Sequence, residues 1–504
     1  MIFKAVTKIQ TKTERDFCLE LIQVYCRLVE VYCEKHQLNI EVKTPSDLEL
    51  VTELLNIGVI ESAEDIPALK SLIGEQYTKF INSVSFAIEY RSEIKSVLKN
   101  LYNSYRKELQ EGWENKPLRV VDFFCGAGGL SLGFIREGFS IALANDIEDV
   151  CIQTYTYNHP ELPSKNIIQG DIKTIVDNVQ DYIVGDIDVV VGGPPCQGFS
   201  EANRQRIIDD PRNELYKYFI KAVERIAPKF VVMENVKGMM KVANQVVEDY
   251  ENLRIKCNGN IYKYKVAYKV LNSQNFCVAQ SRERLIYIAI RNDVMETKNI
   301  TPEKVFDEII SATKSNPIFT LGDALSCIKV LDAPKIRNTN EIDSDITGKK
   351  IDVNAYEYHN NPYLKLINAG RTIPFLFNHK ARYCSDINYE IYKRLNPGDD
   401  ATDDKIKDIM PYAHRNHCFK DKYYKLHADR PCRTITAHLR MDCHSHIHPY
   451  QIRSLTPREA ARVQSFPDDY LFLGAYLKTY MQIGNAVPAL MANGIAKTIK
   501  KYLL

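Results

Sequence analysis

The sequence predicts an α/β fold: a Rossmann-like sheet with helices on both faces, preceded by an all-helical region. Two patterns carry this prediction. From residue 118 onward, short apolar runs rich in Val and Ile alternate with amphipathic stretches of helix length, which is typical of buried strands joined by crossover helices. Before residue 116, apolar residues instead recur every three to four positions, as in Phe17, Leu21, Val24, Leu28 and Val31, which indicates amphipathic helices.

These patterns divide the chain into four segments. Residues 1–115 form the helical region, and residues 112–117 read as a linker. Residues 118–290 form the sheet domain, with strands expected at 118–124, 140–143, 167–168, 189–191, 230–233, 266–270 and 285–290. Residues 291–430 are polar, rich in Asn and Asp, and form a second, irregular lobe. Residues 431–504 complete the sheet domain and end in a helix at 486–500.

The composition excludes several classes of protein. Hydrophobic residues make up 45% and charged residues 26% of the 504 residues, which excludes a disordered, collagen-like or coiled-coil chain. No run of about 18 apolar residues is present, and lysines interrupt the first residues, so we expect no membrane span and an intracellular protein. The 13 cysteines lack a Cys-x-x-Cys pair and are expected to be thiols. The net charge of +2 neither requires nor excludes nucleic acid.

A glycine-rich turn at residues 122–129 follows the first predicted strand. Such a turn lets the backbone approach a ligand closely, although many cofactors are held in this way. Acidic residues follow the next two strands, Asp146 and Asp171. A carboxylate at the end of the second strand suits a ribose diol, and the alternative for either residue is a helix N-cap.

Cys196 follows two prolines, Pro194 and Pro195, at the end of the fourth predicted strand. Open α/β sheets bind substrates at this edge, so a thiolate here would be an exposed nucleophile. The alternative is a buried structural thiol. Glu234 ends the neighbouring strand and is expected to face Cys196, where a carboxyl in a closed pocket can donate a proton; otherwise it is a capping or ion-paired residue.

Two arginines, Arg282 and Arg284, precede the last predicted strand within the sequence Gln-Ser-Arg-Glu-Arg. Residues two apart on an extended segment point to the same face. Their guanidinium groups suit a carbonyl oxygen and phosphates, and the alternative is an ion pair with Glu283 or another acid.

Taken together, these blocks resemble the DNA (cytosine-5) methyltransferases, especially the prokaryotic enzymes. The resemblance covers residues from about 118 to the end, with the blocks in the family's order. They are Phe-Cys-Gly-Ala-Gly-Gly at 124–129, Pro-Pro-Cys-Gln at 194–197, Glu-Asn-Val at 234–236, Gln-Ser-Arg-Glu-Arg at 280–284, the segments 430–436 and 455–467, and Gly-Asn-Ala-Val-Pro at 484–488. The resemblance implies a class I methyltransferase sheet and a target recognition domain at residues 291–430.

The resemblance further implies that S-adenosylmethionine is the methyl donor and S-adenosylhomocysteine the product, with no metal. Phe124 would stack on the adenine, Asp146 would bind the ribose hydroxyls, and Asp171 with Ile172 would hold the adenine edge. The other cofactor residues implied are Gly126, Gly128, Ile147, Pro194, Asn485 and Ala486. Ile147 departs from the family, which often has an aromatic residue there, so one packing contact to the cofactor is expected to be weaker.

The implied reaction is methylation of C5 of cytosine in a specific duplex DNA sequence. Cys196 would add to C6, Glu234 would act at N3, and Arg284 with Arg282 would fix O2 and the surroundings of Cys196. Because the pocket cannot reach a base inside a duplex, the cytosine must be flipped out, and Gln197 to Ser200 would lie in the loop that closes over it. Basic residues of the second lobe would contact DNA: His379, Lys380, Arg382, Lys393, Arg394, Arg415, Lys420 and Lys422.

The expected setting is the prokaryotic cytoplasm, at the nucleoid, without membrane contact. The enzyme would act as a monomer on DNA, with a cognate restriction endonuclease as a functional partner or in a solitary epigenetic role. Residues 1–115 lie outside the resemblance; a scaffold, a DNA clamp or a module for association are the hypotheses for them. Two other functions stay open: cytosine-5 methylation of transfer RNA, and a catalytically inactive DNA-binding regulator.

A zinc cluster is a competing interpretation of the segment that contains Cys443, His444, His446 and His448. Alternation along a strand would send Cys443 and His444 to opposite faces, and no second ligand pair with zinc-finger spacing is visible. The sequence therefore favours no metal.

Overall fold

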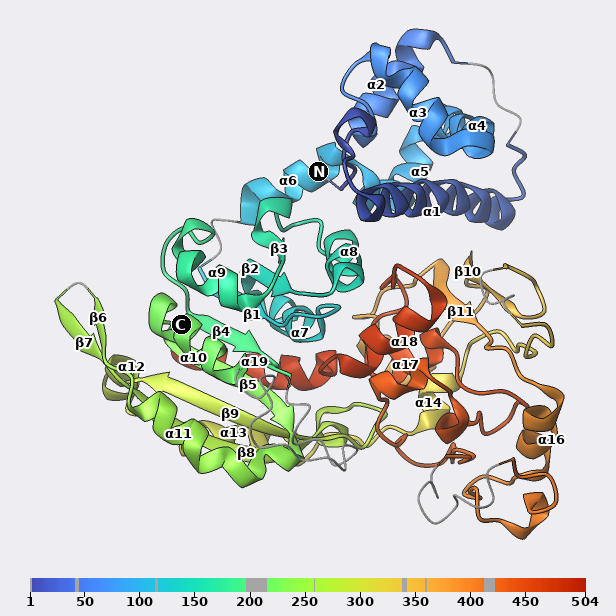
Figure 1. The fold of residues 1–504 in the computed structure, drawn as a ribbon. Coiled ribbons are helices and arrows are strands. Elements are labelled where there is room, and N and C mark those ends of the chain that lie inside the picture. The colour runs from blue at the N-terminus through green and yellow to red at the C-terminus, as the bar shows by residue number, and fades with distance from the viewer. Residues whose placement is uncertain are drawn as a thin grey trace.

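The computed structural model describes residues 2–40, 45–113, 117–195, 215–257, 259–337, 342–358, 360–411 and 422–504. They form a helical N-terminal domain, an α/β lobe and a second lobe with little regular structure (Figure 1). None of the helices within these ranges is long and apolar enough to cross a membrane.

A seven-stranded sheet forms the centre of the α/β lobe, in the order β3-β2-β1-β4-β5-β9-β8. Strands β1 to β5 are parallel to one another, whereas β9 runs antiparallel to both of its neighbours. The predicted α/β class is confirmed, and the sheet is mixed. The strands are β1 (Arg119–Phe123), β2 (Ser140–Asp146), β3 (Ile167–Gln169), β4 (Val189–Gly192), β5 (Phe230–Val236), β8 (Tyr264–Asn272) and β9 (Glu283–Arg291).

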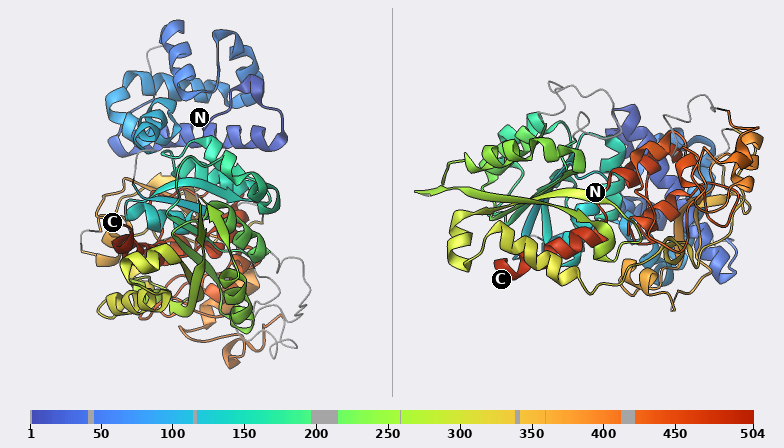
Figure 2. Two further views of the ribbon diagram at one scale, coloured as in Figure 1. Left: turned by 90° about the vertical axis from the view of Figure 1, so that its left-hand side faces the viewer. Right: turned by 90° about the horizontal axis from the view of Figure 1, so that it is seen from below.

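Helices cover both faces of this sheet (Figure 2). Successive strand residues point to opposite faces, so Val120 packs in one hydrophobic core and Val121 in the other. The Val120 side is covered by α7 (Gly129–Arg136), α8 (Asp149–Asn158), α13 (Pro302–Thr313) and α19 (Ala489–Leu503). The Val121 side is covered by α9 (Ile172–Ile175), α10 (Leu215–Ile226) and α11 (Ala243–Glu251). The lobe also contains α12 (Asn292–Lys298) and the hairpin of β6 (Ile255–Cys257) and β7 (Asn260–Tyr262).

The N-terminal domain consists of α1 (Lys12–His36), α2 (Asp47–Ile57), α3 (Ile66–Ile73), α4 (Tyr77–Glu89), α5 (Arg91–Leu98) and α6 (Asn103–Trp113). Capping boxes start α1 and α2, with Thr11 paired to Glu14 and Ser46 to Glu49. The linker prediction at 112–117 is wrong at its start. Helix α6 continues through Trp113, whose ring is buried in the core of the α/β lobe and whose Nε1 donates a hydrogen bond to the carbonyl of Ile141 at 3.0 Å.

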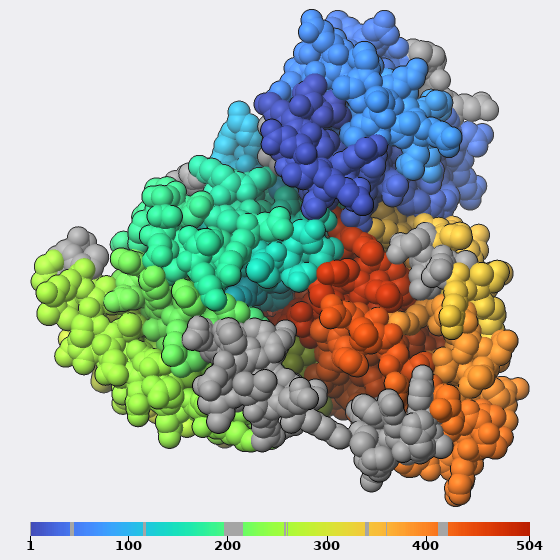
Figure 3. Space-filling model, in the orientation of Figure 1, coloured from blue at the N-terminus to red at the C-terminus, as the bar shows by residue number. Residues whose placement is uncertain are grey.

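The second lobe contains α14 (Leu321–Leu325), α15 (Pro362–Ile367), α16 (Asp386–Arg394) and the two-stranded sheet of β10 (Gly348–Val353) and β11 (Phe375–Lys380). Helices α17 (Pro457–Val463) and α18 (Tyr476–Asn485) lie in this lobe too, beside β11 (Figure 1). Of the expected C-terminal return to the sheet, the helical part is α19, which begins three residues later than predicted and packs against α7 and α13. The surface is hollowed between the two lobes, below the N-terminal domain (Figure 3).

Candidate active site

The glycine-rich turn leaves the carboxyl end of β1. Phe124 adopts a left-handed backbone (φ 57°), a conformation that is uncommon for a residue other than glycine and that clusters at ligand sites. Gly128 is also left-handed (φ 87°), and a Cβ atom on it would lie 2.8 Å from the hydroxyl of Tyr470. A side chain is therefore excluded at Gly128 both by conformation and by space. Around Gly126 the space is open, so this part of the turn faces a region where a ligand can approach.

Asp146 ends β2 and turns its carboxylate toward this turn. Its Oδ2 accepts a hydrogen bond from the backbone N–H of Gly126 at 2.9 Å, and its Oδ1 accepts one from Glu148 at 2.9 Å. Burial raises the pKa of Asp146 above its usual value, while these two bonds oppose the shift. The two sequence-predicted cofactor residues thus lie together. Asp171 instead caps α9 through the N–H of Lys173, which was the alternative for this residue; its contact with adenine stays a prediction.

The last sequence block closes the same region from the other side. A Cβ atom on Gly129 would lie 2.2 Å from the carbonyl oxygen of Val487, so the backbone at 485–488 lies directly against the turn. Asn485 ends α18 and is exposed, whereas Ala486 is buried. The structure therefore brings the first and last blocks together, although more than 350 residues separate them.

A buried polar chain below the turn was not predicted. The hydroxyl of Ser131 donates to Oδ2 of Asp122 at 2.6 Å, and the hydroxyl of Tyr155 donates to Ser131 at 2.7 Å. Burial raises the pKa of Asp122 to about 7. The sequence signal was the position of Asp122 at a strand end, but its partners lie on two different helices and no spacing rule connects them.

Glu234 and Arg284 lie at neighbouring strand ends and pair with each other, which was the ion-pair alternative for both residues; their contacts with a cytosine stay a prediction. Nε of Arg284 lies 2.7 Å from Oε1 of Glu234, and both side chains are largely buried. The amide of Asn235 donates to the carbonyl of Pro194 at 2.9 Å, which joins the end of β5 to the segment after β4. Cys196 follows two residues later and, with Gln197 and Ser200, lies outside the described residues. The carboxyl of Glu234 thus stands beside the segment that leads to Cys196.

The role predicted for Arg282 is corrected by the structure. Its guanidinium is buried and donates to the carbonyls of Ile435 at 2.7 Å and Gly484 at 3.1 Å. Because both contacts are to backbone carbonyls of distant segments, Arg282 is a positioning residue: it joins the 280–284 block to the segment before Asn485. Arg284 alone reaches the acid.

Two residues predicted to contact DNA are internal. His379 is buried between the hydroxyl of Thr456 and the carbonyl of Lys329, and burial lowers its pKa to about 3. Lys380 is buried and pairs with Asp343 at 2.9 Å. Both lie on β11, and their charge in the sequence gave no sign of burial. These two predictions are wrong.

The other residues predicted to contact DNA differ in their partners and in their exposure. Arg382 donates to the carbonyls of Leu439 at 2.8 Å and Met441 at 2.7 Å, so it organises that loop, and a contact with DNA stays a prediction. Arg394 pairs with Glu390 and Asp408, Lys393 is exposed, and Lys422 lies 3.5 Å from Asp442. Arg415 and Lys420 lie outside the described residues.

The side chains of the competing zinc interpretation have other partners. The thiol of Cys443 donates to the carbonyl of Leu439 at 3.2 Å, and Nδ1 of His444 lies 2.7 Å from the hydroxyl of Tyr392. Nδ1 of His448 accepts from two backbone N–H groups. Within the described ranges, no group of three or more His, Cys, Asp or Glu side chains is placed to hold a metal ion.

The fold and the site define an α/β enzyme whose functional residues gather at the carboxyl ends of parallel strands. Residues 118–501 match the family model of the C-5 cytosine-specific DNA methylases. The chain therefore belongs to this family and is a DNA cytosine-5 methyltransferase.

Individual relatives agree with this assignment. The chain is 33% identical over 395 residues to the type II methyltransferase M1.HphI of Haemophilus parahaemolyticus, covering 76% of this chain and 87% of the relative. It is 30% identical over 404 residues to M.DdeI of Desulfomicrobium norvegicum, covering 76% and 89%. A crystal structure assigned as a DNA modification methyltransferase encoded within a prophage of E. coli matches with a TM-score of 0.52 and 26% identity, covering 77% of this chain and 99% of that one.

Proposed function

We propose that this protein methylates C5 of cytosine at a specific sequence in double-stranded DNA, with S-adenosylmethionine as the methyl donor. The observation that carries the proposal is the Glu234–Arg284 pair, held beside the segment that leads to Cys196 and on the same sheet edge as the Gly126–Asp146 contact. One edge thus carries an acid and a cation for a pyrimidine, beside the segment that leads to the predicted nucleophile and next to a turn and a carboxylate that suit a nucleoside.

The glycine-rich turn at 124–129 and Asp146, which we call the cofactor cradle, fit the proposed donor. Asp146 presents a carboxylate at the end of the second strand, which suits a ribose diol, and the backbone at Gly126 has open space in front of it. Phe124 stands in the turn between them, with its ring only partly buried. When bound, the donor supplies an electrophilic methyl group. Asp146, Phe124, Asp171, Ile172 and the segment at 485–486 would hold it.

The chemistry that we assign to the chain's own residues begins at Cys196. Its thiolate adds to C6 of cytosine, and the electron pair of the C5–C6 double bond moves toward C5, which becomes nucleophilic. Glu234 places its carboxyl proton at N3, and Arg284, which fixes Glu234, stabilises the charge that addition creates at the ring. Once C5 carries the methyl group, its proton passes to water, the C5–C6 double bond forms again, the thiolate departs and the N3 proton returns to Glu234.

This chemistry requires a flipped-out base. The acid and the arginine are largely buried at the sheet edge, so a cytosine stacked in a duplex cannot reach them. We assign Gln197 to Ser200, which directly follow Cys196, to the loop that covers the flipped base, and the exposed basic residues of the second lobe to contacts with the duplex.

The relatives support a biological role in restriction and modification. M1.HphI and M.DdeI are type II methyltransferases, and we extend that role to this chain as a hypothesis, with a cognate restriction endonuclease as the functional partner. Action on cellular DNA would place the enzyme at the nucleoid, as a monomer on each target site.

The test is methyl transfer from labelled S-adenosylmethionine to unmethylated duplex DNA, with the product mapped at base resolution. Wild type should label C5 of cytosine in one short sequence, and Cys196→Ala should not. DNA that contains 5-fluorocytosine at the target should trap wild type covalently, because release of the thiolate requires loss of a proton from C5 and fluorine occupies that position. Label on transfer RNA instead of DNA would move the substrate to RNA, and failure to trap would contradict the covalent step.

A further inference from the structure

The N-terminal domain lies outside the family match, yet it shares a hydrophobic core with both lobes. Side chains of α1 and its neighbours pack in one buried cluster with Ile351, Phe375 and Phe377 of the second lobe and with Tyr157 of α8. Leu471 and Leu473, from the segment between α17 and α18, belong to the same cluster. The N-terminal domain therefore packs against both lobes through one shared hydrophobic cluster.

The three parts of the molecule meet at residues 471–474. The N–H of Leu473 donates to the hydroxyl of Thr154 in α8 at 2.9 Å, and the N–H of Phe472 donates to Asn378 in β11 at 2.9 Å. The N–H of Gly474 donates to the carboxylate of Glu20 in α1 at 2.8 Å. Each of three successive backbone donors thus goes to a different part of the chain, and we call residues 471–474 the junction segment.

Glu20 also contacts the second lobe directly. The same carboxylate oxygen that accepts from Gly474 pairs with the ammonium group of Lys350 in β10, and the carboxylate is mostly buried. About two helical turns further along α1, Nε of Arg27 donates to the carbonyl of Ile351 at 3.0 Å. Two side chains on one face of α1 therefore hold β10.

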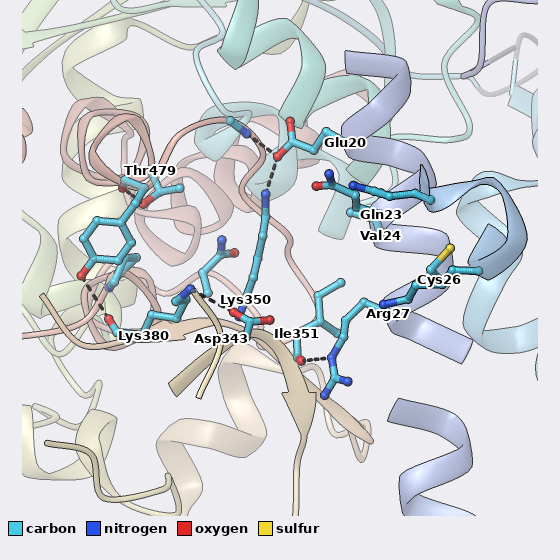
Figure 4. Close-up of a pocket in the computed structure, with 16 residues that line it drawn as sticks. Glu20, Gln23, Val24, Cys26, Arg27, Asp343, Lys350, Ile351, Lys380 and Thr479 are labelled. Atoms are coloured by element: carbon cyan, nitrogen blue, oxygen red, sulfur yellow. Dashed lines mark hydrogen bonds and ion pairs between the residues drawn. The ribbon is translucent and has the colours of Figure 1, made fainter. Parts of the chain in front are cut away.

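The surroundings of Glu20 are hollow. A cavity of 610 Å³ lies between α1, β10 and the start of α18, with Glu20, Lys350 and Lys380 on its wall (Figure 4). Because side chains do not fill the space beside Glu20, the polar bonds of Glu20 and Arg27 hold β10 there, next to the hydrophobic contacts of Ile351, Phe375 and Phe377.

On its other side the domain is fixed to the α/β lobe. Arg106 of α6 is buried and donates to the carbonyl of Thr156, near the end of α8, at 3.0 Å. Trp113 is buried in the core of the lobe, as described above. The domain is thus anchored on the cofactor side by Arg106 and Trp113, and on the side of the second lobe by a hydrophobic cluster and, next to the cavity, by the polar bonds of Glu20 and Arg27.

We propose that the N-terminal domain is a brace that fixes the second lobe relative to the α/β lobe, and that Glu20 is the positioning residue of this brace. The proposal deepens the proposed function, on which it rests for the second lobe's role in DNA binding. Because Glu20 touches neither the cofactor cradle nor the Glu234–Arg284 pair, its loss should loosen the grip on DNA and leave cofactor binding unchanged.

The test compares Glu20→Ala, Glu20→Gln and Lys350→Met in the full-length protein. Glu61→Ala is the control, since Glu61 makes an exposed ion pair with Lys8 inside the same domain. Amide hydrogen exchange is measured first, without substrate, over β10, β11 and the junction segment. Glu20→Ala should accelerate exchange in β10 and at Gly474 about tenfold, because losing the bonds to Glu20 lowers the free energy of local opening there. Glu20→Gln retains an acceptor for Gly474 and should accelerate exchange mainly in β10, as should Lys350→Met.

Methylation kinetics form the second measurement. Glu20→Ala should raise KM for DNA at least fivefold while KM for S-adenosylmethionine changes less than twofold, and Glu61→Ala should change neither. Wild-type exchange in β10 with Glu20→Ala or with Lys350→Met would overturn the brace, as would an equal rise of both KM values. Hydrogen exchange reports on the brace even if wild type methylates no DNA, so the two proposals fail separately.

Discussion

Nε of Arg284 lies 2.7 Å from Oε1 of Glu234, across the neighbouring antiparallel strands β5 and β9. In the strand register Arg284 stands opposite Val236, so its side chain reaches back by two residues to the acid. With the side chains 14% and 12% exposed, water competes little for this contact. The carboxyl of Glu234 is therefore held in one orientation before any substrate arrives.

Removing the arginine should impair the chemical step. We expect Arg284→Met to lower the single-turnover rate of methyl transfer by about 100-fold, the usual loss when one preorganised charge-stabilising group is removed. The dissociation constant for S-adenosylmethionine, measured by calorimetry, should stay within twofold. Lys237→Met is the matched control, because Lys237, the residue after β5, makes an exposed ion pair at 2.9 Å with Glu283 of β9. Equal losses in the two variants would contradict a special role for Arg284.

A methyl group on Gly193 should displace the acid. A Cβ atom there would lie 2.9 Å from Oε2 of Glu234, closer than real Cβ contacts allow. Gly193→Ala should therefore lower kcat about tenfold or more with little change in cofactor binding, since small displacements of a catalytic group are costly. Gly112→Ala, where a Cβ atom meets open space in α6, should have wild-type kcat. Wild-type kcat in Gly193→Ala would show that Glu234 can move without cost.

Stability should fall in mild acid because of His379. Burial lowers its pKa to about 3, so in the folded state it stays neutral where the unfolded chain takes up a proton. The unfolded state then binds more protons below about pH 6.5, and stability decreases as pH falls from 6.5 toward 3. At pH 5.5, proton uptake by His379 in the unfolded chain lowers the free energy of unfolding by about 1.4 kcal/mol relative to pH 7.5.

The variant that checks this is His379→Gln, which retains a donor for Lys329 and an acceptor for Thr456. The free energy of unfolding, measured in urea at pH 7.5 and 5.5, should drop by about 1.4 kcal/mol less in the variant than in wild type. Burial also lowers the pKa values of His444 and His446, so these residues add to the pH dependence of the free energy of unfolding in wild type and in the variant alike. Identical slopes would show that His379 gains no proton on unfolding.

An aromatic residue at position 147 should strengthen cofactor binding. Ile147 follows Asp146 directly and is 62% exposed, so its side chain packs on little of the protein. Ile147→Trp would offer a ring to the adenine, and aromatic contacts of this kind contribute about 0.5–1.5 kcal/mol, or roughly 2- to 13-fold in affinity. Titration calorimetry with S-adenosylhomocysteine measures the change. Val184→Trp, at an 80% exposed site on the same lobe, should bind as wild type does.

The sequence predicted those site residues whose position follows from a strand end. Gly126, Asp146 and Glu234 lie at or just after the carboxyl ends of parallel strands, which share one edge, so their proximity follows from topology. Arg284 reaches the same edge from the amino end of β9, because β9 runs antiparallel to β5. Arg282 was assigned the wrong contact because its partners lie 153 and 202 residues away. No periodicity could have revealed them.

The second lobe was less predictable for a physical reason. Its basic residues were expected at the surface, since Lys is mostly exposed and His often is, but His379 and Lys380 are buried where β11 packs against α17 and the junction segment. Irregular structure has no period from which burial can be derived. The role of the N-terminal domain was hidden in the same way, because Glu20 looks like any other acid on an amphipathic helix.

The position of α19 has a consequence for the order in which the protein folds. This helix buries Ile495 and Ile499 against the sheet, but it is synthesised after the whole second lobe and its junction segment. One apolar face of the sheet therefore stays partly uncovered while residues 292–488 leave the ribosome. Nascent chains with such a face are prone to aggregate, and chaperones or a low growth temperature help them to fold. We expect the yield of active enzyme in a heterologous host to rise when translation is slowed by lower temperature.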